Sequence, residues 1–147
     1  KDRVDDAVHA VKAAIEEGIL PGGGHALLCA STQIQNDTLN SSQEMGYEIV
    51  RKSIRKPFYQ ILSNAGYNHE KCTLAALNVE GNFELGWNLA TENKVNMLSE
   101  GIIDPTKVTR CALENAASAA GILLTTECVI TDTPKKESES VSEQPMF

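Results

Sequence analysis

Aromatic residues are scarce in this sequence of 147 residues, which contains one Trp, three Tyr and three Phe. They are scattered along the chain, so they form no platform on which successive bases of a single-stranded nucleic acid would stack. The formal net charge of −7 also argues against a non-specific surface for nucleic acid or for an anionic membrane. We therefore expect neither nucleic acid nor a membrane among the partners.

Long apolar runs are also lacking. No stretch reaches the roughly 20 residues that cross a bilayer, and no signal-peptide pattern opens the sequence. Apolar residues make up 41% and charged residues 22%, which is ordinary for a soluble globular domain. The sequence starts with Lys1 inside a helical pattern, and we expect it to be a piece of a longer chain.

Closely spaced metal ligands are the third absence. The cysteines lack the spacing of zinc or thioredoxin-type sites, and no two histidines have ligand spacing. We expect no metal site in this chain, cysteines buried as free thiols in a reducing compartment, and histidines that are exposed or hydrogen-bonded. These residues are Cys29, Cys72, Cys111, Cys128, His9, His25 and His69.

Apolar residues at helical spacing fill most of the chain and predict a mainly α fold. Gly18 and Gly66 are predicted to end helices. Asp104 is predicted to cap the last helix, with Pro105 in its first position. The expected helices are 3–17, 25–34, 43–55, 57–66, 69–78 and a long one that follows Asp104.

Two segments favour extended structure. Residues 81–94 alternate apolar and polar side chains between turn formers, which predicts a short β-hairpin. Residues 126–132, "TECVITD", predict one strand, whose partner would come from a missing part of the chain or from another subunit, because a lone strand has two unpaired edges. Residues 134–147 are charged and rich in Ser, which predicts a disordered tail.

Three local features are candidates for one site: the pair Asp5 and Asp6, the glycines of "PGGGHALL" at 21–28, and Asp104. A glycine-rich loop before a helix presents backbone N–H groups to phosphate, but this one lacks lysine and matches no phosphate-loop or dinucleotide motif. Taken one at a time, these features have simpler interpretations: a solvated helix face, a mobile turn and a helix cap.

A resemblance to group I chaperonin subunits of the GroEL type rests on three segments in order: "KDRVDDAVHAVKAAIEEGILPGGGHALL", "GWNLAT" and "EGIIDPTKVTRCALENAASAAGILLTTECVITDTP". It runs from residue 1 to about residue 134. It implies that residues 1–17 end the intermediate domain and that residues 18–133 are the C-terminal part of the equatorial ATP-binding domain. The apical domain and the main phosphate- and magnesium-binding loop would then lie outside this sequence.

The same resemblance implies an ATP site. Asp6 matches the catalytic aspartate that moves in with the intermediate domain and positions or activates the attacking water. Asp104 matches the aspartate that binds the ribose hydroxyls. Gly23 would contact the nucleotide directly. The other residues implied to bind ATP are Gly22 and Gly24 in the glycine loop, and Asn88, Leu89, Ala90 and Ile102 beside the adenine.

The implied function is that of an ATP-dependent chaperone. The full-length subunit would hydrolyse ATP with Mg²⁺ and refold non-native client proteins in the cavity of a homo-oligomeric double ring closed by a co-chaperonin lid. This chain alone would have no useful ATPase activity, because half of the nucleotide site would be missing. The expected location is the bacterial cytoplasm, with the mitochondrial matrix or a plastid as alternatives.

Three departures from the family pattern keep an alternative open. Leu89 stands where alanine is usual, "ENKVNML" lacks an aromatic residue, and the tail lacks Gly-Gly-Met repeats. The alternative is a divergent ring-forming scaffold or moonlighting paralogue with weak or no ATPase activity, against which the presence of Asp6, the three glycines and Asp104 argues. A small helical binding module is a third interpretation, and the unpaired strand argues against it.

Overall fold

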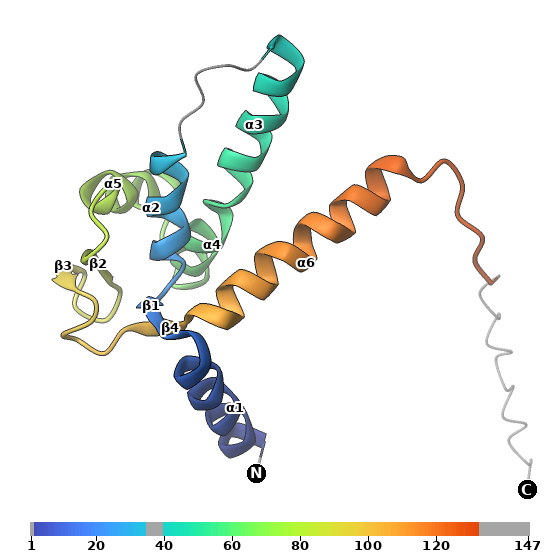
Figure 1. The fold of residues 1–147 in the computed structure, drawn as a ribbon. Coiled ribbons are helices and arrows are strands. Elements are labelled where there is room, and N and C mark those ends of the chain that lie inside the picture. The colour runs from blue at the N-terminus through green and yellow to red at the C-terminus, as the bar shows by residue number, and fades with distance from the viewer. Residues whose placement is uncertain (1, 35–39, 133–147) are drawn as a thin grey trace, which may run out of the picture.

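The computed structural model describes residues 2–34 and 40–132, which form six helices and two small antiparallel sheets (Figure 1). The mainly α prediction is confirmed. The helices are α1 Asp2–Glu17, α2 His25–Gln33, α3 Ser41–Ser53, α4 Lys56–Asn64, α5 His69–Val79 and α6 Thr106–Thr125. The strands are β1 Ile19–Pro21, β2 Leu85–Asn88, β3 Asn93–Asn96 and β4 Ile103–Pro105, with β1 paired to β4 and β2 to β3.

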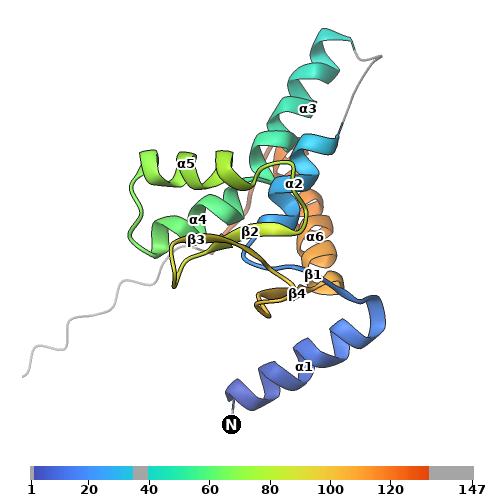
Figure 2. The ribbon, with the colours of Figure 1, turned by 90° about the vertical axis from the view of Figure 1, so that its left-hand side faces the viewer.

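The core lies in a body formed by α2, α4, α5 and the β2–β3 hairpin, from which α1, α3 and α6 extend (Figures 1 and 2). α1, α3 and α6 have no buried residue. Their apolar side chains face outward; Ile15 is 79% and Leu124 87% exposed. The core cluster comprises Leu28, Phe58, Leu62, Cys72, Ala75, Ala76 and Val79.

The six predicted helices are confirmed, with ends that differ by one or two residues. Gly18 (φ +84°) ends α1, and its N–H donates to Ala14 O at 2.8 Å. Gly66 (φ +87°) follows α4 in the same left-handed conformation, which glycine adopts without the penalty of a Cβ. The predicted hairpin is confirmed as β2–β3. None of the helices in the described part of the chain is long and apolar enough to cross a membrane.

Two sequence predictions about extended structure and capping are wrong. Residues 126–132 form no strand, because no described segment pairs with them and an isolated strand lacks its hydrogen-bond ladder. Asp104 caps no helix and Pro105 is not the first helical residue. Both belong to β4, where Asp104 lies opposite Leu20, and α6 begins at Thr106 with Pro105 as its N-cap. The predicted tail, 134–147, lies outside the described residues.

The cysteines only partly follow the prediction of buried thiols. Cys29 and Cys72 are buried, Cys111 is half-buried and Cys128 is exposed. Cys29 lies beside His25, which is fully buried at the start of α2. The histidine Nε2–H donates to Asn82 O at 2.8 Å, and Nδ1 has no partner within the described residues. Burial therefore lowers the pKa of His25 below its ordinary value.

Stability is expected to fall with acid through His25. Its pKa is lowered on folding, so below the ordinary value of 6.5 the unfolded chain binds more protons than the folded chain. The contribution of the neutral His25 side chain to the free energy of unfolding is present in full above pH 6.5 and is lost as the pH falls below that value. The midpoint temperature of thermal unfolding, measured between about pH 8 and pH 5, should show this loss. In a His25→Gln variant, the midpoint temperature should not change over the pH range in which the histidine titrates. Parallel profiles for parent and variant would contradict the assignment.

Candidate functional site

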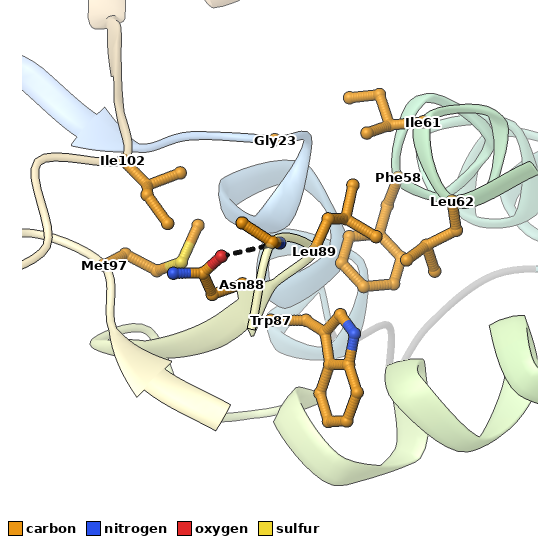
Figure 3. Close-up of a pocket in the computed structure, with 10 residues that line it drawn as sticks. Gly23, Phe58, Ile61, Leu62, Trp87, Asn88, Leu89, Met97 and Ile102 are labelled. Carbon is orange, nitrogen blue, oxygen red and sulfur yellow. Dashed lines mark hydrogen bonds between the residues drawn. The ribbon is translucent and has the colours of Figure 1, made fainter. Parts of the chain in front are cut away.

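A mostly apolar cavity of about 270 Å³ lies between the turn after β1, helix α4 and the β2–β3 hairpin (Figure 3). Ile102 lies on one side of it, and Phe58, Ile61 and Leu62 of α4 lie on the other. The full set of lining residues is Gly23, Phe58, Ile61, Leu62, Trp87, Asn88, Leu89, Ala90, Met97 and Ile102.

Each glycine of the triple-glycine turn has its own structural reason. A Cβ on Gly22 would lie 3.1 Å from the backbone of Ile103, and the Gly22 N–H donates to Ile102 O at 2.9 Å. A Cβ on Gly24 (φ +74°) would lie 2.7 Å from the backbone nitrogen of Phe58. Gly23 (φ +65°) has nothing within 4 Å of such a Cβ and lines the cavity. Close backbone packing therefore explains the outer two glycines, and only the middle one faces the open space.

The wall opposite this turn comes from the end of β2. Asn88 Oδ1 accepts a hydrogen bond from Ala90 N at 2.9 Å, which fixes the turn that follows the strand. Leu89 is half-buried and packs against the core cluster, as does Trp87. The side chain of Leu89 lies toward Phe58 in Figure 3, so it occupies part of the space between the hairpin and α4.

Ile102 is fixed by backbone hydrogen bonds on both sides. Its N–H donates to Met97 O at 2.9 Å, and its carbonyl accepts from Gly22. Met97 in turn lies over Gly86 of β2, where a Cβ would come within 2.5 Å of the methionine Sδ. The cavity therefore joins four segments of the chain, which contribute residue 23, residues 58–62, residues 87–90 and residues 97–102.

The two acidic candidates lie outside this lining. Asp104 is half-buried in β4, two positions beyond Ile102. Asp6 is exposed on α1, which packs mainly on α6 and β4. The structure thus brings together five of the nine predicted site residues around the cavity, and it leaves Asp6, Gly22, Gly24 and Asp104 away from the lining.

Ion pairs hold the C-terminal end of α1 against α6. Arg110 Nη2 lies 2.6 Å from Glu17 Oε1, and Arg110 Nη1 lies 2.9 Å from Glu114 Oε2. Lys107 pairs with Glu16. The hydrogen bond from Arg110 lowers the pKa of Glu17. The two pairs between the helices, Lys107 with Glu16 and Arg110 with Glu17, join the C-terminal end of α1 to α6 beside the Gly18 turn, while Asp6 lies nearer the N-terminus of α1.

Sequence reasoning missed five lining residues: Phe58, Ile61, Leu62, Trp87 and Met97. The apolar periodicity of α4 marks a face turned to the core, but it does not tell which of those side chains border an open space. Trp87 packs on the core cluster and also lines the cavity.

A mostly apolar cavity beside a glycine turn is the kind of concave site in which small molecules bind. The chain belongs to the TCP-1/cpn60 chaperonin family, whose model matches residues 1–134. It is similar to a solved structure described as a group III chaperonin in the open state, with 30% identity and a TM-score of 0.63. That match covers 80% of this chain and 25% of the other, so the chain spans about a quarter of the length of the solved chaperonin.

Proposed function

We propose that the chain is the C-terminal part of a group I chaperonin subunit, an ATP-driven machine that refolds other proteins inside a ring. Residues 1–17 would end the intermediate domain, and residues 18–133 would complete the equatorial domain. One observation carries the proposal. Gly23, the turn from Asn88 to Ala90, and Ile102, which the chaperonin resemblance assigns to a nucleotide site, line one cavity.

The lining fits a nucleotide base better than a charged group. Leu89 and Ile102 offer apolar surface to a flat ring. Asn88 Oδ1 is already engaged by a backbone N–H, so the base would be held mainly by apolar contact. The ribose would extend toward Asp104 and the phosphates past Gly23, where no Cβ blocks the backbone.

Magnesium would be held elsewhere in the subunit. The described residues contain no group of three His, Cys, Asp or Glu side chains placed to bind a metal. Mg²⁺ bound with ATP would neutralise phosphate charge. The residues of this chain would hold the base and the ribose of ATP and would supply one carboxylate for hydrolysis.

That carboxylate would be Asp6. It is exposed on a helix that leaves the body through Gly18, at which φ is +84° and a Cβ would meet open space. Rotation of α1 about this turn would bring Asp6 to the phosphates, where it would orient the attacking water. Gating by such a movement would couple hydrolysis to the state of the ring. We further propose a homo-oligomeric double ring, a co-chaperonin lid and non-native proteins as partners, and a bacterial cytoplasm or an organelle interior as the location.

The scaffold alternative is favoured by one observation. Leu89 lines a cavity of about 270 Å³, a volume just below the range of roughly 300 to 1,000 Å³ for small-molecule sites. A subunit in which this side chain excludes the base would keep its fold and its ring contacts and would hydrolyse little ATP.

Truncation of Ile102 tests the base site. Ile102→Ala in the complete subunit is expected to weaken ATP binding about tenfold in titration calorimetry, because apolar surface facing the base is lost. The matched control is Ile103→Ala, one residue along, which is exposed and does not line the cavity. Equal affinities for the two variants would contradict the placement of the base.

A further inference from the structure

A second cavity, of about 510 Å³, lies along α4 and α5 and reaches the end of α3 (Figure 2 shows these three helices together). Among the described residues, no acidic side chain lines it. We call it the basic groove, and its lining residues are Arg51, Lys52, Arg55, Lys56, Tyr59, His69 and Thr73.

The groove concentrates positive charge on an acidic chain. Four of the 13 Lys and Arg residues fall within residues 51–56, a stretch without Asp or Glu, while the whole chain has a net charge of −7. Such segregation creates a local positive potential that attracts anions.

In the described part of the chain, carboxylates neutralise only two of these four cations. Arg51 Nε lies 2.9 Å from Glu48 Oε1, and Arg55 Nη1 lies 3.0 Å from Glu80 Oε1. Lys52 and Lys56 are exposed and make no ion pair within residues 2–34 and 40–132. Two ammonium groups in the groove are therefore available to a ligand.

The placement of Lys56 is unfavourable for the helix itself. Arg51 and Lys52 stand in the last turn of α3, where cations interact well with the helix dipole. Lys56 is instead the first residue of α4, and Arg55 is its N-cap, a helix end that favours negative charge. Glu80 compensates Arg55, and a bound anion would do the same for Lys56.

We propose that the basic groove binds a small ligand that carries two or more phosphate groups. Lys52 and Lys56 supply the charge, because lysine binds phosphate as a compact point charge. The Tyr59 hydroxyl, which accepts a long hydrogen bond of 3.5 Å from Arg55, is free to donate its own proton to a phosphate oxygen. The groove volume lies within the range of small-molecule sites, which favours a compact ligand over an acidic peptide.

Titration of the complete subunit with inorganic pyrophosphate tests the proposal. We expect saturable binding in calorimetry with a Kd below about 1 mM, weakened at least about tenfold in Lys52→Gln/Lys56→Gln. The matched control is Lys12→Gln/Lys94→Gln, which removes the same charge from exposed positions outside the groove and should change Kd less than about twofold. ATP hydrolysis should be the same in both double variants.

Four results would overturn the proposal. Absence of saturable binding would exclude the site. If pyrophosphate bound equally well to Lys52→Gln/Lys56→Gln, the anion would lie at the nucleotide site or on another surface. An equal loss of affinity in the control variant would mean that binding depends only on the net charge of the protein. Tighter binding of a hexaglutamate peptide than of pyrophosphate would identify an acidic-peptide surface instead.

Discussion

Asp6→Ala is expected to lower ATP hydrolysis by the complete subunit by about two to three orders of magnitude while leaving ATP binding nearly unchanged. Asp6 is exposed on α1 and does not line the cavity that we assign to the base, so its removal takes nothing from the binding surface. We propose that Asp6 acts in hydrolysis only after α1 has brought its carboxylate to the attacking water. Steady-state turnover beside ATP titration separates the two effects.

Asp5→Ala is the matched control, since Asp5 is also exposed and precedes Asp6 on the same helix. A step of about 100° around α1 turns it to another direction, and turnover should change less than about twofold. Equal losses in the two variants would mean that the charge of the helix matters and that Asp6 has no specific position in the reaction.

Gly24→Ala is expected to destabilise the fold by about 3 kcal/mol, which is a large fraction of the stability of a typical domain. Gly24 has φ +74°, and a Cβ there would lie 2.7 Å from Phe58 N and 3.0 Å from Phe58 Cα. These are backbone atoms at the start of α4, so relief requires the helix to move away from α2. Urea unfolding followed by the fluorescence of Trp87, which packs on the same core, measures the loss.

Gly23→Ala separates backbone strain from the clash. Gly23 has φ +65°, but a Cβ there meets nothing within 4 Å. Only the left-handed conformation is then penalised, at about 1 kcal/mol. A Gly24→Ala variant no less stable than Gly23→Ala would show that α2 and α4 do not pack at the distance described.

Local sequence signals predicted the helices well because their causes are local. Gly18 and Gly66 end α1 and α4 through φ angles that other residues rarely adopt. The β1–β4 pair escaped prediction because each strand has only three residues, too few for alternation to be visible. That pair also explains the error at Asp104, since pairing with β1 keeps the chain extended through Pro105 and delays the start of α6.

The strand predicted at 126–132 does not form, because strand formation depends on a partner segment and not on local signals alone. Its composition favours extended structure, but a strand forms only with a partner, and the described chain offers none. At the site, Gly23, Leu89 and Ile102, which the chaperonin resemblance assigned to ATP binding, line one cavity, and their role in ATP binding stays a prediction. The α4 side of the cavity, including Phe58, could not be predicted, because it depends on how α4 packs against the hairpin.

The central claim is that the cavity beside Gly23 receives the base of ATP. A structure of the complete subunit with a non-hydrolysable ATP analogue and Mg²⁺ tests it most directly. We predict that the base lies between Leu89 and Ile102, with the ribose beside Asp104 and the phosphates passing Gly23. An analogue bound at another place, with Leu89 filling the cavity, would contradict it and would leave the scaffold interpretation in its place.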